Sequence, residues 1–125
     1  MKLIILVVCA VFLSDATAHR YSGDDEQKRV YFITPSDGIT TTNPVKIKFG
    51  ATGINILPSG VDVPDSGHHH LLINVDKLPD LKSPIPADSN HLHFGDGQTE
   101  TELNLPKGKH TLQLLIGNYL HIPHS

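Results

Sequence analysis

The chain has 125 residues, a formal net charge of −3 with neutral histidines, one cysteine and no tryptophan. This length allows one domain of ordinary size. The charge balance offers no basic surface for nucleic acid and no polybasic patch for a membrane. Cys9 lies near the amino terminus, so the rest of the chain has neither a thiol nor a disulfide. That part must fold on its core alone or with help from a metal.

Residues 1–18 are typical of a secretory signal peptide. Lys2 gives a positive start, and residues 3–13 form an apolar run that is shorter than the roughly 20 residues a bilayer span needs. An Ala-Thr-Ala cleavage site follows at 16–18, with a cut after Ala16 as the alternative. We therefore expect an exported protein, secreted or periplasmic, that begins at His19. Residues 19–29 are polar and of mixed charge, which is typical of a flexible arm.

Short β-type segments separated by turns follow in chain order. Residues 30–34 (VYFIT) are rich in β-forming side chains, and a Pro-Ser-Asp-Gly turn follows at 35–38. Residues 45–49 (VKIKF) alternate apolar side chains with lysine, as a strand with one face in a core does. Glycines and prolines at 50–67 predict a long structured loop.

Four further segments in the second half of the chain also read as strands. They are 68–75 (HHHLLINV), 91–94 (HLHF), 99–105 (TETELNL) and 110–116 (HTLQLLI), with a proline-rich loop at 76–90. No segment has helical periodicity, so we predict a single all-β domain at 30–125, an antiparallel immunoglobulin-like β-sandwich. Such a sandwich usually has a seventh strand, and the sequence ends where one would begin, so we expect the last strand to be lacking.

The nine histidines are the chemically distinctive feature of the chain. Side chains two apart in a strand lie on the same face, so His68 pairs with His70, and His91 pairs with His93. If Leu71 faces the core, His69 shares its side and the first pair lies on the opposite face. A slip of one residue in register would exchange the two sets.

Two such pairs on strands about 4.8 Å apart would place four ring nitrogens on one face. That spacing suits Cu–N or Zn–N bonds of about 2.0 Å. We therefore predict a copper or zinc site. The predicted ligands from the two strands are His68, His70, His91 and His93. The tail would add His121 and His124, either as further ligands or as a lid. The alternative is structural: a hydrogen-bonded histidine cluster, His93 packed beside Phe94, and a disordered tail.

The remaining polar residues have weaker patterns. His110 lies on the apolar face of its strand, which favours a partly buried structural imidazole. His19 could chelate Cu(II) through its ring and free amine if it begins the mature chain. Glu100 and Glu102 share a face and would either orient ligating imidazoles or mark the solvent side of an edge strand. The sequence contains no nucleophile elbow, phosphate loop, dinucleotide fingerprint or H-E-x-x-H motif.

The segments GHHHLLI, HFGDGQTE and GKHTLQLL, together with VYFITPSDG, NPVKIKFG and LHIPH, resemble an uncharacterised family of small exported proteins. That family is classed as a domain of unknown function and is best known from bacterial periplasms. The resemblance covers nearly the whole mature chain and implies a compact β domain with no established activity. Residues 91–96 (HLHFGD) are also similar to the copper-binding strand of copper-zinc superoxide dismutase, and the opening of the domain looks like that of periplasmic copper-resistance carriers.

Three functions follow from these patterns. The first is an exported domain of unknown function that binds copper or zinc without catalysing a reaction. The second is a structural or protein-binding module whose histidines form a hydrogen-bonded, pH-sensitive cluster. The third is a copper redox enzyme similar to a dismutase. The sequence identifies no protein partner for any of them.

Overall fold

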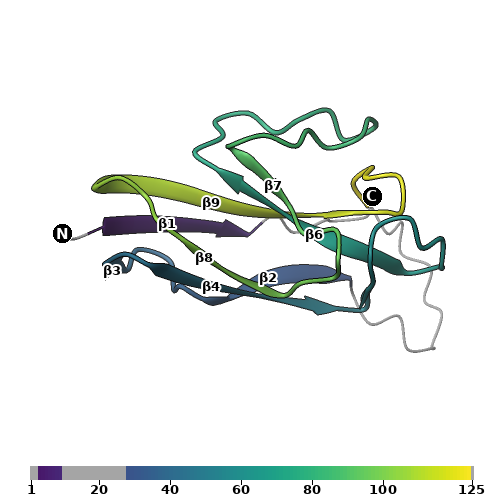
Figure 1. Cartoon of the computed structure of the whole chain (residues 1–125), viewed down its shortest axis with the longest axis horizontal. Coiled ribbons are helices and arrows are strands. Elements are labelled where there is room, and N and C mark those ends of the chain that lie inside the picture. Colours follow the sequence, from purple (N-terminus) through teal and green to yellow (C-terminus); the bar gives the residue numbers. More distant parts are fainter. Residues whose placement is uncertain (1–2, 10–27, 125) are drawn as a thin grey trace, which may run out of the picture.

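The computed structural model describes residues 3–9 and 28–124, which form two β-sheets packed face to face (Figure 1). The predicted all-β sandwich is confirmed. No helix occurs in the described residues, and so none that could cross a membrane. The strands in chain order are β1 (Leu3–Cys9), β2 (Arg29–Thr34), β3 (Thr40–Thr41), β4 (Val45–Thr52), β5 (Asn55–Ile56), β6 (Ser66–Ile73), β7 (His91–His93), β8 (Glu100–Leu103) and β9 (Gly108–Gly117).

The larger sheet carries the histidine-rich strands. Its order is β3-β1-β9-β6-β5, and β7 also pairs with β6. Strand β6 runs antiparallel to β9, from the pair His68–Gly117 to the pair Ile73–Leu112. Strand β7 runs antiparallel along the other edge of β6. The smaller sheet has the order β2-β4-β8. Strand β6 is therefore hydrogen-bonded along both edges, which holds its side chains in fixed positions.

The main core lies between the two sheets. Val45, Ile47 and Phe49 of β4 point inward, whereas the lysines between them are exposed, as the alternation of the sequence predicts. Leu71 of β6 and Leu114 of β9 meet them from the larger sheet. Burial of these apolar side chains drives the sheets together, and it also decides which face of each strand is available for chemistry.

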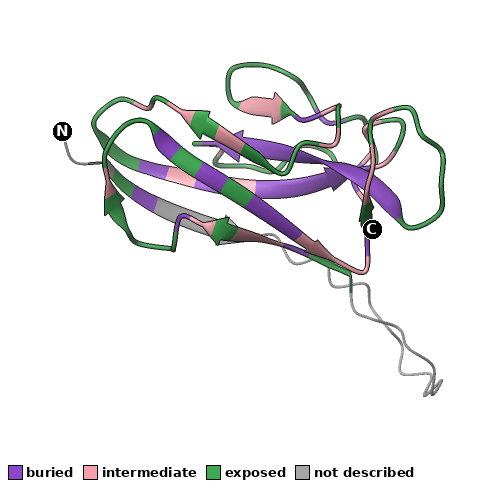
Figure 2. Ribbon diagram, turned by 60° about the horizontal axis from the view of Figure 1, so that its bottom comes forward, coloured by how far each residue is buried: buried purple, intermediate pink, exposed green. Residues whose placement is uncertain are grey.

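Strand β6 is buried at every position, unlike β4, whose burial alternates along its first half (Figure 2). Its outer face is covered because the loop at 74–90 places Ile85 against Leu72 and Leu115 in a second, smaller cluster. The C-terminal tail is tied to that loop by a 2.8 Å hydrogen bond from the Ile85 amide to the His121 carbonyl. The face of β6 that carries alternate histidines is thus enclosed by loop and tail.

Several segments differ from the sequence-based expectation. The apolar segment assigned to a signal peptide forms strand β1, parallel to β9, and Ile5 is buried in the main core. Removal of residues 1–18 as a signal stays a prediction. The short strand β5 lies in the segment 50–67 that was expected to be a loop, and β3 lies between the expected turn at 35–38 and the expected strand at 45–49. Most of the expected arm at 19–29, together with His19 and the cleavage site, lies outside the described residues.

Candidate metal centre

Strand β6 directs its three consecutive histidines to two different faces. His69 points into the main core, where its ring centroid lies 5.0 Å from that of Phe49. His68 and His70 point to the outer face, and both are almost fully buried, at 1% and 0% exposure. Leu71 belongs to the main core. Because side chains alternate between the two faces of a strand, His69 then shares the inner face with Leu71, and His68 and His70 lie on the outer face. The conditional prediction of the faces of this strand is therefore confirmed.

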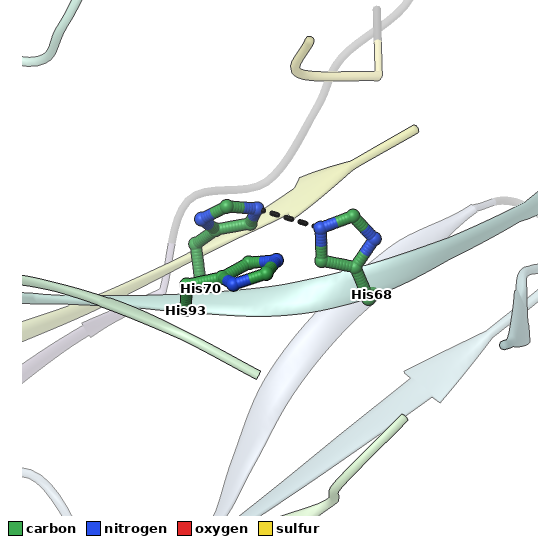
Figure 3. A group of neighbouring side chains, drawn as sticks. All are labelled: His68, His70 and His93. Atoms are coloured by element: carbon green, nitrogen blue, oxygen red, sulfur yellow. Dashed lines mark hydrogen bonds between the residues drawn. The ribbon is translucent and has the colours of Figure 1, made fainter. Parts of the chain in front are cut away.

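Strand β7 adds a third imidazole to the outer face. The antiparallel register places His93 directly opposite His70. The ring centroids of His68, His70 and His93 lie 4.8, 4.9 and 5.0 Å apart. Each ring offers one nitrogen, and the three nitrogens all lie within 4.8 Å of one another (Figure 3). We call these three residues the histidine trio.

The C-terminal tail places a fourth imidazole against the trio. The ring centroid of His121 lies 4.7 Å from that of His93, 5.0 Å from that of His68 and 6.0 Å from that of His70. Two strands and a tail turn thus bring four imidazoles together from three separate segments of the chain. The trio and His121 together are the four-ring cluster.

Two glycines leave room for these rings. A Cβ atom on Gly117 would lie 2.7 Å from Nε2 of His70, and a Cβ atom on Gly95 would lie 2.9 Å from Nε2 of His93. Both distances are well below van der Waals contact. Neither glycine has the positive φ that would by itself favour glycine. The absence of a side chain at these two positions is therefore a condition for the rings to lie where they do.

The environment keeps the trio neutral. Burial, followed by repulsion from the neighbouring imidazoles, lowers the pKa of His68 from 6.5 to about 4 and that of His70 to about 3. Burial and the charge of His121 also lower the pKa of His93, although Asp96 opposes the shift. At neutral pH the rings therefore carry unprotonated nitrogens, which is the state in which imidazole ligates a metal.

The polar atoms of His68 and His70 are incompletely satisfied by the protein. Their Nε2 atoms lie 3.0 Å apart and share a hydrogen bond whose direction depends on the tautomers. Nδ1 of His70 is buried with no hydrogen-bond partner among the described residues. Buried polar atoms are nearly always paired, so this nitrogen is an exception. A cation takes the place of the proton shared by the two Nε2 atoms only when that proton moves to Nδ1 of its ring.

Two of the predicted ligands lie apart from the cluster. His91 lies opposite Leu72, two residues and about 7 Å along the strand from His93. Its Nδ1 atom lies 2.8 Å from Oδ1 of Asp88, and the hydrogen bond from His91 is the main reason that the pKa of Asp88 is lowered. Nε2 of His124 donates to the carbonyl of Ser66 at 2.6 Å. The structure brings neither ring into the trio.

His110 has the structural role expected from the sequence. Nδ2 of Asn74 donates to its Nδ1 at 2.9 Å, and its Nε2 donates to the Pro106 carbonyl at 2.7 Å. Oδ1 of Asn74 in turn accepts from the amide of Thr111 at 3.0 Å. These bonds join the end of β6 to the start of β9 and leave His110 no free ring nitrogen.

Of the two roles that the sequence left open for a pair of glutamates, the structure supports the solvent side of an edge strand and not the orienting of imidazoles. Glu100 and Glu102 lie on β8 in the smaller sheet, paired with Lys48 and Lys46 of β4. Nζ of Lys48 lies 3.9 Å from Oε2 of Glu100, and both side chains are largely exposed. Nearness in sequence to the HLHF segment was misleading, because the chain crosses to the other sheet between β7 and β8.

Comparison with known proteins identifies the family. The model for the family described as Domain of unknown function (DUF4399) matches residues 47–125, more than half of the chain. The chain belongs to the DUF4399 family. The resemblance to an uncharacterised domain family is thereby confirmed, and the match includes the whole four-ring cluster. No curated protein and no solved structure matches the chain.

Proposed function

We propose that this DUF4399 domain is an exported protein that binds one copper or zinc ion through His68, His70 and His93, without catalysing a reaction. The observation that carries the proposal is the convergence of three imidazole nitrogens within 4.8 Å from two paired strands. Export rests on the signal-like composition of residues 1–18. His121 lies beside the trio and is the candidate for a further ligand.

The spacing of the nitrogens is close to what a metal needs. With bonds of 2.0–2.1 Å, neighbouring ligand nitrogens lie about 3.3 Å apart around tetrahedral zinc. They lie roughly 2.8 Å apart at adjacent corners of a square-planar copper site. The 3.0 Å between the Nε2 atoms of His68 and His70 falls between these values. The remaining separations are longer, up to 4.8 Å, so an ion would have to draw the rings closer together.

The donor set selects the class of metal. Neutral imidazoles suit Cu(II) and Zn(II), whereas Ca²⁺ and Mg²⁺ require oxygen ligands. The four-ring cluster contains no thiolate, so it does not have the ligands of a blue-copper site. The Irving–Williams order favours Cu(II) over Zn(II) at a site of nitrogen donors, and the supply of each metal decides which is bound in practice.

A second candidate function is a pH-sensitive structural module. The direct hydrogen bond between His68 and His70 favours it, because the two rings satisfy one another without a metal. Protonation of both rings would break this bond and place two positive charges 3.0 Å apart in a buried site. In this case the cluster would hold loop, tail and β6 together at neutral pH and loosen them in acid.

Metal titration distinguishes the two functions. The metal-free full chain is titrated with Cu(II) and with Zn(II) against a competing chelator. We expect one ion per chain and an affinity that falls at least about 100-fold in His93→Ala, which removes a ligand from the exposed side of the trio. His91→Ala is the matched control and should bind as the unaltered chain does. Equal affinity in the His93→Ala chain, or no stoichiometric binding by the unaltered chain, would refute the proposal.

A further inference from the structure

The four-ring cluster combines ligands of two kinds. His68 and His70 are buried on a strand that is hydrogen-bonded along both edges. His93 is exposed but belongs to β7, which pairs with β6. His121 is half-buried and lies on a turn of the tail outside both sheets. The sheet therefore fixes three rings, whereas the position of the fourth depends on the tail.

The turn that carries His121 is stabilised mainly by its own hydrogen bonds. The His121 amide donates to the Asn118 carbonyl at 2.8 Å. Oδ1 of Asn118 accepts from the amides of Leu120 and Ile122 at 2.8 and 3.1 Å. The bond from the Ile85 amide to the His121 carbonyl, at 2.8 Å, links the turn to the neighbouring loop. At the base of the turn, Gly117 forms a bridge with Pro123, and the His124 amide donates to the Ile116 carbonyl at 2.9 Å. Loss of the bond to Ile85 would therefore free the tip of the turn while its base stays attached to β9.

The backbone and surface of this turn favour opening. His121 has a φ of 66°, in the left-handed region that side-chain-bearing residues rarely adopt. Strained backbone of this kind persists where surrounding contacts enforce it, and it is common at functional sites. Tyr119 and Leu120 are 37% and 51% exposed, so the tip of the turn has little apolar burial to hold it closed. Segments with few buried contacts open at low free-energy cost.

We propose that His121 is the exchangeable ligand of the metal centre and that the domain passes its ion on to an acceptor rather than storing it. This inference rests on the proposed metal binding. The tail turn opens and withdraws His121. A neutral imidazole of the acceptor then takes the position that His121 has left. His93, on the exposed side, is displaced next, and the buried pair releases the ion last.

Each step of this transfer replaces one neutral nitrogen ligand by another. The metal keeps its oxidation state, and neither electrons nor protons are exchanged overall. Ligand-by-ligand exchange avoids a free aqueous ion, because the acceptor binds before the last protein ligand leaves. The order of exchange follows from exposure, because His93 and His121 are accessible to solvent whereas His68 and His70 are buried.

Transfer kinetics test this role. Chain loaded with Zn(II) is mixed in a stopped-flow instrument with excess chromophoric chelator. In the unaltered chain, opening of the turn precedes attack, so the transfer rate should reach a plateau as chelator concentration rises. In His121→Ala the coordination position of the missing imidazole is open to the chelator from the start. Its rate should rise linearly with chelator concentration and exceed the plateau by at least about tenfold, while the trio loses at most about tenfold in affinity.

Two further variants complete the test. Asn118→Ala keeps the imidazole and removes the bonds that close the turn, so the plateau rate should rise. His91→Ala removes an imidazole outside the cluster and should transfer as the unaltered chain does. Identical kinetics in His121→Ala and the unaltered chain, or an unchanged plateau in Asn118→Ala, would overturn the inference while leaving metal binding intact. Failure of the unaltered chain to bind Zn(II) or Cu(II) would instead remove the proposed function.

Discussion

Gly117→Ala tests whether the space beside His70 is a requirement of the site. The new Cβ atom would lie 2.7 Å from Nε2 and 3.1 Å from Cδ2 of His70, and 3.2 Å from the backbone Cα of His121. To reach an ordinary contact of about 3.5 Å, the imidazole has to move by about 0.8 Å. His70 is fully buried, so the ring moves only by leaving its rotamer or by pushing the tail outward.

The expected effect has two parts. Ligands of a binding site have to be held within about 0.5 Å of their productive positions, so a 0.8 Å shift should weaken metal binding by about 10- to 100-fold. Overpacking a buried site should also lower the free energy of unfolding by about 1–3 kcal/mol. Both quantities are measurable on one sample, by chelator competition and by urea denaturation.

Gly50→Ala is the matched control. A Cβ atom on Gly50 would crowd the ring of Tyr31, with the hydroxyl oxygen at 2.8 Å, in the smaller sheet. This variant should lose stability and bind metal with unchanged affinity. Gly117→Ala with an affinity equal to that of the unaltered chain would refute the argument that the ring of His70 needs this space.

Three other predictions concern the histidines outside the metal centre and the effect of acid. His69→Leu should raise the free energy of unfolding by about 1–3 kcal/mol in urea at pH 7, because both ring nitrogens of His69 are buried beside Phe49 without a hydrogen-bond partner among the described residues; a loss of stability would contradict this. Burial lowers the pKa of His69 from 6.5 to about 4. Between these pH values the unfolded chain therefore binds more protons than the folded chain. The free energy of unfolding should fall by about 3 kcal/mol for this residue alone as the pH drops from 6.5 to 4. A urea midpoint that does not change with pH would disprove this. Asn74→Ala removes the hydrogen bonds to His110 and Thr111 and should lower the free energy of unfolding by about 1–3 kcal/mol in thermal denaturation. Asn74→Gly should recover part of this loss, because glycine adopts the φ of 54° at this position without strain. Equal stability of the two variants would count against this interpretation.

The sequence predicts the local features of this fold well. The alternation in VKIKF identifies the inner face of β4, and Leu71 fixes the side of β6 on which His68 and His70 lie. These features depend on residues within one strand, where side-chain direction follows from position alone. The short strands β3 and β5 have two residues each and no periodicity to detect.

The assembly of the site depends on features that a single sequence does not encode locally. The loop at 74–90 separates β6 from β7, and its length is compatible with either His91 or His93 opposite His70. In the observed register His93 lies opposite His70, and His91 is hydrogen-bonded to Asp88 instead. His121 reaches the trio through a left-handed turn in a segment with no regular pattern. The separation of Gly117 and Gly95 in sequence gives no hint that both border the same cluster.

X-ray absorption spectroscopy of the chain loaded with one equivalent of Cu(II) or Zn(II) is the most direct test of the metal centre. We predict three or four nitrogen ligands at about 2.0 Å, with the multiple-scattering pattern of imidazole, and one imidazole fewer in His93→Ala. A first shell made mainly of oxygen atoms, or an imidazole count that His93→Ala leaves unchanged, would contradict the assignment of the ion to these histidines.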